Sequence, residues 1–434
     1  MENASINHFY GKIKWSATWT GSNTNTVFIM IGGMLTLHHE LEVRGMNDKI
    51  PKNKNNDYST ESIFERLEFI RSQTGLPLEN IGNYTVDPER FKGNIENPIG
   101  FAQTPIGIVG PITINGDHAN GKFYVPMSTL EGTMTISYNR GCRLISKAGG
   151  ARVMVLKDAI QRAPVFILAN AGKAREFMHF IQTNLDTFKQ ETMKVTQHGR
   201  LVQCECYAVG KAVYTRFEFS TGDAMGMNMI TQATANIVVA ILRQFPVEDY
   251  YLESNMGVDK KPSHINMLHG RGKTVTAEVV IPRHYVNRYL GTTPERIFKL
   301  FRYGHMGCTL AGVHGGNLQF ANGIAAVFLA CGQDMANVAE SSTGAGLVEV
   351  TDQGDLYYSI TLPSLVVATI GRGTALPTQR ECLEIMGCFG EGKVLKLAEI
   401  IAAVVLAGEL SLAGAICHGD WVSSHEKYGR NKPE

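Results

Sequence analysis

The chain has 434 residues, which is enough for roughly two or three domains, and its 44% hydrophobic and 19% charged residues are ordinary for a globular protein. The formal net charge is +1 and no long run of like charge occurs. We therefore predict no nucleic-acid partner, because a protein that binds a polyanion needs a basic face.

The eight cysteines include no C-x-x-C pair, so we expect reduced thiols and no bound metal. No segment reaches the roughly 18–20 apolar residues that span a bilayer. The nearest candidate, residues 27–37, lacks the basic start and the cleavage site of a signal peptide. We expect a cytoplasmic protein with no membrane partner.

Residues 1–58 are rich in Asn, Thr and turn-forming residues, and we predict a poorly ordered N-terminal extension there. The segment Ser59–Ser62 then supplies the chemistry of a helix start, apolar residues follow at helical spacing, and Gly75 fits the helix end. A small helical region is therefore expected over residues 59–95.

The next segments alternate between strand and helix patterns. We expect short strands and turns over 97–114, then a strand over 121–127 that leads into a helix near Ser128. An α+β module follows, with strands at 153–156, 165–168, 202–209 and 212–219 and helices at about 173–188 and 223–242.

The C-terminal half alternates Gly-rich loops with long apolar helices, notably over 318–339 and 398–416. No G-x-G-x-x-G follows a strand anywhere in the chain. A dinucleotide, if one binds, is therefore expected on a fold other than the Rossmann fold.

Asp259-Lys260-Lys261-Pro262 places an acid beside two ammonium groups, and Pro262 disfavours helix at Lys261, so we predict a loop. Two interpretations stay open for this loop. It is a solvated turn, or it is an anion clamp in which one lysine faces a developing oxyanion and the other faces a substrate carboxylate. In the clamp, Asp259 holds the nearer ammonium in place.

Three further segments carry acid–base groups. Glu131 is either an acid in the first turn of a helix or a carboxylic acid kept protonated by apolar surroundings, so that it donates a proton. Asp334 follows an apolar helical run, where an ionised carboxylate is costly unless a lysine pairs with it. His425, near the chain end, suits a proton donor to a thiolate or an alkoxide.

The segment 222–229 is unusual because it combines a helix start with closely spaced methionines. Asp223 is predicted to be the N-cap, and Gly226 lets the backbone approach a ligand. The methionines can form a soft apolar bed for a flat ring, and the first N–H groups of the helix suit a phosphate.

Taken in order, these segments closely resemble the 3-hydroxy-3-methylglutaryl-coenzyme A (HMG-CoA) reductase family over roughly residues 60 to 427. The form of the Asp259–Pro262 loop and the Ser-His near the end look like the class I branch, without the membrane region of its eukaryotic members. The matching segments are 96–100, 107–111, 129–132, 139–143, 222–229, 259–262, 270–273, 332–334, 408–411 and 424–425.

The resemblance implies an α+β fold with a large mixed substrate domain, residues 96–163 and 254–434. It also implies a small, ferredoxin-like, non-Rossmann cofactor domain inserted at 164–253. The implied activity is the NADPH-dependent, four-electron reduction of (S)-HMG-CoA to (R)-mevalonate and CoA, the committing step of isoprenoid biosynthesis. Members of the family form homodimers, or oligomers built from dimers, with active sites at the subunit interface.

Carried over residue by residue, the resemblance implies that Lys260 stabilises the oxyanion, Glu131 supplies protons to the carbonyl oxygen, and Asp334 sits between them. His425 protonates the departing CoA thiolate. The implied substrate ligands are Ser137, Asn139 and Arg140 for CoA, and Arg162, Ser254, Asp259 and Lys261 for the hydroxymethylglutaryl end. The implied cofactor ligands are Asp223, Met225, Gly226, Met227, Asn228, Met229 and Gln333.

Several positions depart from the family pattern. Arg372 replaces a glycine, Gln319 stands where many relatives have His, and Tyr303 stands where relatives often have a lysine. The match at Ser254 needs a loop one residue shorter than usual; otherwise Glu253 takes that place. Gln197 stands where a basic residue would favour the 2′-phosphate of NADP, but Lys194, His198 and Arg200 are close, so NADPH is expected and NADH stays open.

Two alternatives remain. One is the degradative direction, NAD-dependent oxidation of mevalonate. The other is a catalytically silent CoA-binding relative, which is expected to have lost a catalytic group, whereas this chain keeps all four.

Overall fold

The computed structural model describes residues 9–10, 13–14, 30–31, 34–35 and 49–419. Most of the extension predicted over 1–58 lies outside these residues, and so does His425. The first described elements are two pairs of short strands, β1 (Phe9–Tyr10) with β2 (Ile13–Lys14) and β3 (Met30–Ile31) with β4 (Met34–Leu35).

Helix α1 (Thr60–Thr74) begins and ends where its sequence predicts. The Ser59 hydroxyl caps it by accepting a hydrogen bond from the N–H of Ser62 at 3.2 Å. Gly75 closes it in the left-handed conformation, with φ 71°. A 3₁₀ turn, η1 (Pro88–Phe91), follows before the first long strand.

One ten-stranded sheet runs through the molecule, and its strands pair antiparallel apart from the parallel contact between β5 and β7. A doubly wound parallel sheet is therefore absent from the described residues, as the missing Rossmann motif predicts. Seven strands follow one another as hydrogen-bonded neighbours, in the order β11 (Asp249–Tyr251), β8 (Val165–Ile167), β10 (Ala212–Ser220), β7 (Ala151–Arg162), β12 (Gly272–Ile281), β14 (Leu356–Leu365) and β13 (Ala345–Val350). Three more strands complete the sheet: β5 (Ile106–Gly116) pairs with β7 and with β6 (Asn120–Ser128), and β9 (Arg200–Val209) pairs with β10.

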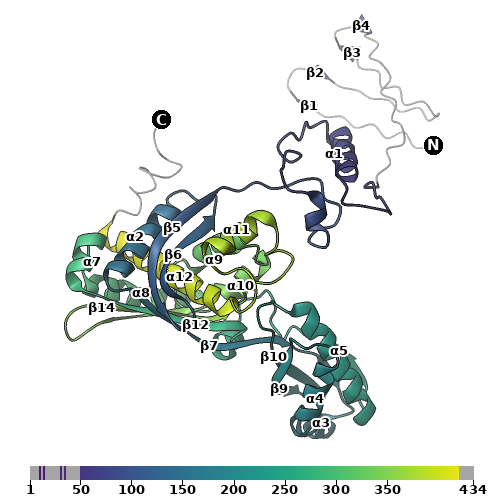
Figure 1. Cartoon of the computed structure of the whole chain (residues 1–434). Helices are drawn as coiled ribbons and strands as arrows, with labels where there is room; N and C mark the ends of the chain where they lie inside the picture. The colour runs from purple at the N-terminus through teal and green to yellow at the C-terminus, as the bar shows by residue number, and fades with distance from the viewer. Residues whose placement is uncertain (1–8, 11–12, 15–29, 32–33, 36–48, 420–434) are drawn as a thin grey trace.

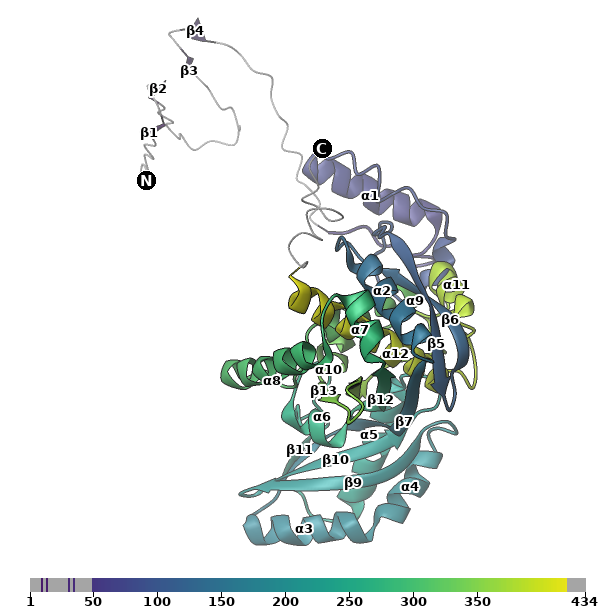
Figure 2. The ribbon, with the colours of Figure 1, turned by 90° about the vertical axis from the view of Figure 1, so that its left-hand side faces the viewer.

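Strand β7 connects two parts of the molecule that have separate hydrophobic cores (Figures 1 and 2). Its first part pairs with β12 from Arg152 onward, and its last residues, Ile160–Arg162, pair with β10. The sheet is thus continuous, although the cores on its two parts are distinct.

The smaller part contains β8, α3 (Ala171–Thr183), α4 (Leu185–Met193), β9, β10, α5 (Met227–Gln244) and β11. Its four strands lie in the order β9-β10-β8-β11. Figure 2 shows α3 and α4 below the long β9–β10 hairpin. The helix predicted at 173–188 is two helices, because the chain turns at Asn184, which ends α3 and begins α4. The helix predicted at 223–242 is α5. It begins at Met227 rather than at Asp223, since Gly226 occupies the N-cap with φ 79°.

The larger part is built around α12 (Val394–His418), which Figure 1 shows in yellow within the larger body. This helix is long and apolar enough to cross a membrane, so the expectation that no such segment exists was wrong. However, 83% of its most apolar window is buried inside the protein, as in the core helix of a folded domain.

Two helix boundaries in this part correct the sequence predictions. Helix α2 (Met134–Lys147) begins at Met134, not near Ser128, so Glu131 lies in the preceding loop and is not in a first helical turn. Helix α9 (Phe320–Cys331) ends at Gly332, which has φ 66°, so Asp334 is not inside a helix. The remaining elements are α6 (His264–His269), α7 (Arg283–Leu290), α8 (Pro294–Ala311), η2 (Met335–Asn337), α10 (Val338–Ser341) and α11 (Pro377–Ile385).

Candidate functional site

The Asp259–Pro262 segment is a loop before α6, as predicted, and its backbone is unusual at Lys260. Lys260 has φ 58°, in the left-handed region that costs a non-glycine residue about 1 kcal/mol or more. Such a conformation persists only where surrounding contacts impose it. Here the backbone N–H of Lys260 donates to Oε1 of Glu340 at 3.1 Å.

The side chain of Lys260 forms an ion pair with Asp334, with 2.8 Å between Nζ and Oδ2. The hydrogen bond to Asp334 raises the pKa of Lys260 above its ordinary value, although burial opposes the shift. The ammonium is therefore charged at neutral pH and held in one place. The lysine partner expected for Asp334 is present, while Oδ1 of the same carboxylate caps η2 by accepting from the N–H of Ala336 at 3.0 Å.

The sequence interpretation expected Asp259 to hold the nearer ammonium; its charge contributes to raising the pKa of Lys260, but within residues 49–419 it forms no ion pair with that ammonium. Its Oδ1 pairs instead with Nη2 of Arg271 at 2.6 Å. Lys261 is exposed, and its ammonium donates to the carbonyl of Asp259 at 3.2 Å. Of the two lysines, Lys260 forms an ion pair with the carboxylate of Asp334. Lys261 forms no ion pair with a carboxylate among the described residues.

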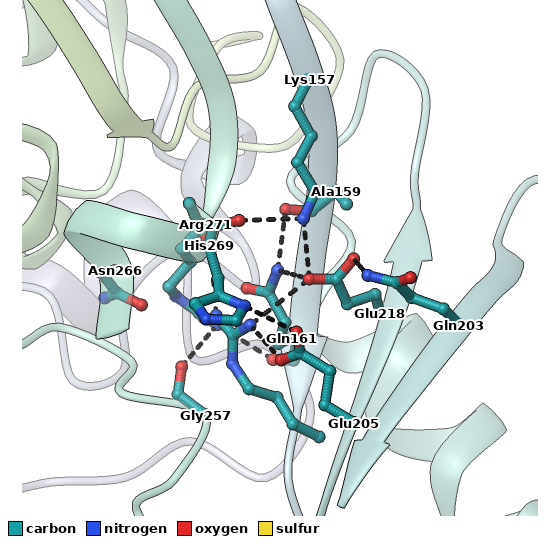
Figure 3. A network of polar contacts seen from close by, with 12 residues as sticks. Lys157, Ala159, Gln161, Gln203, Glu205, Glu218, Gly257, Asn266, His269 and Arg271 are labelled. Carbon is teal, nitrogen blue, oxygen red and sulfur yellow. Dashed lines mark hydrogen bonds and ion pairs between the residues drawn. The ribbon is translucent and has the colours of Figure 1, made fainter. Parts of the chain in front are cut away.

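Arg271 is a buried residue to which the sequence analysis gave no role. Its guanidinium donates to the carbonyls of Gln161 and Gly257 at 2.9 and 3.1 Å (Figure 3). Its Nη2 also lies 3.2 Å from Sδ of Met227. Arg271 therefore ties the Asp259 loop to β7 and to the start of α5. The signal for it was an arginine between two glycines, Gly270 and Gly272, both with positive φ.

A second buried network joins the smaller part to the segment just before β12 (Figure 3). Arg216 pairs with Glu205 at 3.1 Å and with Glu218 at 3.3 Å, and it donates to the carbonyl of Gly270 at 3.0 Å. Glu205 also contacts Nδ1 of His269 at 2.6 Å. Burial acts to raise the pKa of Glu205, but the contacts with Arg216 and His269 outweigh it and leave that pKa below its ordinary value.

Arg162 and Ser254, predicted to face the hydroxymethylglutaryl end, lie at one junction. Arg162 forms an ion pair with Glu253 and donates to the hydroxyl of Thr231 at 2.8 Å. The Ser254 hydroxyl donates to the carbonyl of Ala163 at 2.6 Å. Both candidates for the serine position, Glu253 and Ser254, therefore lie beside Arg162–Ala163.

The predicted CoA ligands are half-buried on α2 and contact α12 and β5. Arg140 donates from Nε to the hydroxyl of Ser411 at 2.9 Å and from Nη2 to its carbonyl at 2.6 Å. The hydroxyl of Ser137 also lies 2.9 Å from that of Ser411. Oδ1 of Asn139 accepts from the N–H of Gly110 at 2.8 Å. Their role toward CoA stays a prediction.

Asp223 caps a different helix from the one predicted. Its carboxylate accepts the N–H groups of Gly392, Lys393 and Val394 at 2.8, 2.9 and 3.0 Å, at the start of α12. Burial raises the pKa of Asp223, but these backbone N–H groups outweigh burial and lower it below the ordinary value. The smaller part is therefore fastened to the central helix of the larger one.

The other predicted cofactor ligands are spread over the same region. Met225 and Met227 pack against the smaller core, Asn228 is exposed, and Sδ of Met229 accepts from the hydroxyl of Thr196 at 2.9 Å. The buried amide of Gln333 is occupied by backbone: it accepts from the N–H of Ala368 at 2.8 Å and donates to its carbonyl at 3.0 Å.

Glu131 stands apart from this dense hydrogen bonding. Its side chain is exposed, and within residues 49–419 its carboxyl makes no hydrogen bond or ion pair. The apolar surroundings that the sequence interpretation required are therefore not provided by this chain in the described region. The structure brings Lys260 and Asp334 together, whereas Glu131 contacts neither.

The structure shows what surrounds three of the residues that depart from the family pattern. Arg372 donates to the carbonyl of Lys92 at 2.8 Å, and Tyr303 is exposed on α8. The amide of Gln319 donates to the carbonyl of Gly408 at 2.6 Å, beside the buried Glu409. Within the described ranges no group of three or more His, Cys, Asp or Glu residues is arranged to hold a metal ion.

Comparison with known proteins supplies the family. The family described as hydroxymethylglutaryl-coenzyme A reductase matches residues 62–430. The 3-hydroxy-3-methylglutaryl-coenzyme A reductase of Pyrococcus abyssi (strain GE5 / Orsay) is 45% identical over 374 residues, which are 84% of this chain and 92% of that protein. The enzyme of the same name from Methanothermobacter thermautotrophicus is 43% identical over 373 residues, 85% of this chain and 94% of that one.

A solved structure, the class II 3-hydroxy-3-methylglutaryl-CoA reductase from Streptococcus pneumoniae bound to NADPH in open conformations, has a TM-score of 0.62 to this chain. The match covers 81% of this chain and 86% of that one at 21% identity. At that identity the similarity shows a shared fold, mixed α/β with an antiparallel sheet. The class I resemblance of the sequence stays a prediction.

Proposed function

Because the chain belongs to the hydroxymethylglutaryl-coenzyme A reductase family, we propose that it catalyses the NADPH-dependent reduction of HMG-CoA to mevalonate and CoA. The observation that carries the proposal is the Lys260–Asp334 ion pair, held at 2.8 Å on a loop whose backbone is itself fastened. A fixed ammonium is what a carbonyl reduction needs at the oxygen that becomes negative.

In this mechanism the bound cofactor supplies the hydride, and the protein supplies position and charge. Lys260 donates a hydrogen bond to the carbonyl oxygen as negative charge develops on it, first at the thioester and then at the aldehyde. Asp334 keeps the ammonium charged and oriented. We propose that Lys261, the next residue along this exposed turn, meets the substrate carboxylate.

Glu131 and His425 are proposed as the proton donors. Glu131 protonates the carbonyl oxygen, and His425 protonates the CoA thiolate as it leaves. Because Glu131 is exposed here, we propose that a second copy of the chain covers it in a homodimer. The large apolar side chains of Ile106 and Ile136, exposed to 52% each in the neighbouring β5 and α2, support a surface that another subunit covers.

We also propose that the smaller part, residues 164–253, is the cofactor domain. Numbered within this part, its strands β8, β9, β10 and β11 lie in the order 4-1-3-2, which supports a ferredoxin-like arrangement. The larger part, 96–163 and 254–434, then binds HMG-CoA, after the small helical region 59–95. We propose a cytoplasmic location, supported by the burial of the apolar helix α12.

The test is an absorbance assay of cofactor oxidation with HMG-CoA, run in parallel with NADPH and NADH. We expect two equivalents of NADPH oxidised per mevalonate formed, with NADPH preferred. Acetyl-CoA, which lacks the distal carboxylate, is the control substrate and should not be reduced at a comparable rate. Preferential reduction of NAD⁺ when mevalonate and CoA are supplied together would establish the degradative direction, and a folded protein inactive with both cofactors would contradict the proposal.

A further inference from the structure

Glu340, in the short helix α10, connects the two members of the Lys260–Asp334 pair. Its side chain is fully buried, and Oε1 accepts from the backbone N–H of Lys260 at 3.1 Å and from Nδ2 of Asn337 at 2.7 Å. Asn337 in turn donates its backbone N–H to the carbonyl of Asp334 at 3.0 Å. Oε1 of Glu340 therefore bonds both to the loop that carries Lys260 and to the turn that begins at Asp334.

Two buried oxygen atoms at this junction have no hydrogen-bond partner among the described residues: Oε2 of Glu340 and Oδ1 of Asn337. An ionised carboxylate and an amide oxygen are both acceptors, so neither can satisfy the other. A proton on Oε2 removes the difficulty, because the resulting O–H can donate to Oδ1 of Asn337 while Nδ2 donates to Oε1. Buried polar groups are rarely left unpaired, which favours the protonated carboxyl over the ionised one.

The charges around Glu340 favour the same state. Lys260 is paired with Asp334 at 2.8 Å, and Arg271 is paired with Asp259 at 2.6 Å, while Nε of Arg271 lies 3.4 Å from Oε1 of Glu340. Each nearby cation therefore has its own carboxylate, and an ionised Glu340 would be a surplus buried charge.

The helices and strands that pack against α10 do not change this balance. Helix α9 and strand β14 contain no charged residue, and the turn η2 brings only the amide of Asn337 to Glu340. Burial raises the pKa of Glu340, and the contacts from Asn337, Lys260 and Arg271 only partly oppose it.

We propose that Glu340 is a positioning residue held as a neutral carboxylic acid, which fixes the left-handed backbone of Lys260 against the Asp334–Asn337 turn without adding negative charge beside the Lys260 ammonium. The inference rests on the proposed role of Lys260 at the oxyanion. An ionised carboxylate next to that ammonium would weaken its attraction for the developing oxyanion, whereas the neutral acid keeps the geometry and leaves the field intact.

The kinetic test compares three variants of the full-length protein. Glu340→Gln keeps an acceptor for Lys260 and places a donor opposite Oδ1 of Asn337, so kcat, KM and the pH profile of kcat should stay within about twofold of wild type. Glu340→Ala removes the bridge, and kcat for HMG-CoA should fall at least about tenfold with the KM for NADPH nearly unchanged.

Glu399→Ala is the matched control, because Glu399 is an equally buried glutamate whose Oε2 accepts from the N–H groups of His118 and Ala119, between β5 and β6, at 2.9 and 2.6 Å. It should lose stability but not kcat. A Glu340→Gln variant as slow as Glu340→Ala would overturn the proposal, since it would mean that the charge of Glu340 is required. Equal kcat losses in Glu340→Ala and Glu399→Ala would also overturn it.

Infrared spectroscopy tests the protonation state without turnover. The difference between wild type and Glu340→Gln at neutral pH should contain the carbonyl band of a protonated carboxyl, which other buried acids cannot contribute because both proteins share them. A carboxylate band in its place overturns the neutral assignment. If wild type shows the protonated band but does not reduce HMG-CoA, the proposed function fails and the protonation of Glu340 stands.

Discussion

Lys260 and Glu131 are proposed to act on the same oxygen, yet their surroundings in the chain are opposite. Lys260 is fastened at both ends, through its backbone N–H to Glu340 and through its ammonium to Asp334. Glu131 lies in an exposed loop between β6 and α2, and its one hydrogen bond within residues 49–419 is from its backbone N–H to the hydroxyl of Thr129 at 3.0 Å.

The difference indicates how the proposed site is assembled. The half that is proposed to stabilise the oxyanion is built within one chain, from segments around residues 260, 271, 334 and 340. The half that supplies protons is not desolvated by the described part of the chain. We therefore expect the Lys260 half to respond to changes in internal packing, and the Glu131 half to respond to what covers it.

Removing the ammonium of Lys260 should have the largest effect. We expect Lys260→Ala to lower kcat about 10³-fold, the loss typical of an oxyanion donor, while leaving the protein folded because the side chain is 44% exposed. The measurement is NADPH oxidation with HMG-CoA, with circular dichroism to verify folding. Lys261→Ala is the matched control and should mainly raise the KM for HMG-CoA; wild-type activity in Lys260→Ala would refute the mechanism.

Glu131→Gln should lower kcat about 10²–10³-fold, because general acid catalysis contributes roughly that much. The free energy of unfolding should change by less than about 0.5 kcal/mol, since the side chain is exposed and makes no described contact. Glu79→Gln, at another exposed loop glutamate, should leave both quantities unchanged. A large loss of stability in Glu131→Gln would contradict the contrast between the two halves.

Glu409 tests the internal support of the Lys260 half, since it holds the start of α9, the helix that leads to Asp334. Its carboxylate accepts the N–H groups of Leu318 and Gln319 at 2.9 and 2.6 Å. Burial raises the pKa of Glu409 from 4.5 to about 7. The folded protein therefore keeps a proton that the unfolded chain loses between these two values, so stability falls as pH rises through this window.

As pH rises from 4.5 to about 7, the ionisation of Glu409 in the unfolded chain should lower the free energy of unfolding by up to about 3 kcal/mol. Glu409→Gln cannot ionise and should lack this component. Urea unfolding at several pH values measures it as a difference between wild type and variant that changes across the window. Two unfolding curves that stay parallel from pH 5 to 8 would show that Glu409 does not titrate there.

His425 should give the smallest and most selective effect. His425→Gln is expected to slow reduction of HMG-CoA about tenfold or more, because the CoA thiolate then leaves without its proton donor. Reduction of the free aldehyde, mevaldate, has no thiolate leaving group and should be spared. Parallel assays with the two substrates measure the ratio, and equal losses would refute the proposed role.

Much of the local structure followed from the sequence, because its causes are local. Ser59 and Gly75 bound α1 through hydrogen bonds and a left-handed φ that depend on a few neighbouring residues. Pro262 kept the Asp259–Pro262 segment out of a helix for the same reason. Glu131 was placed in the wrong element because the strand before it and the helix after it leave a loop that no capping residue marks.

The partners of buried polar groups came only with the tertiary structure. Asp223 looked like the cap of its own helix, but it caps α12, which begins far along the chain at Val394. Arg271 and Glu340 carried no role in the sequence, yet they hold Asp259 and Lys260. The type of a side chain determines which hydrogen bonds it can make. Once the side chain is buried away from water, the packing of distant segments decides which partner it bonds to.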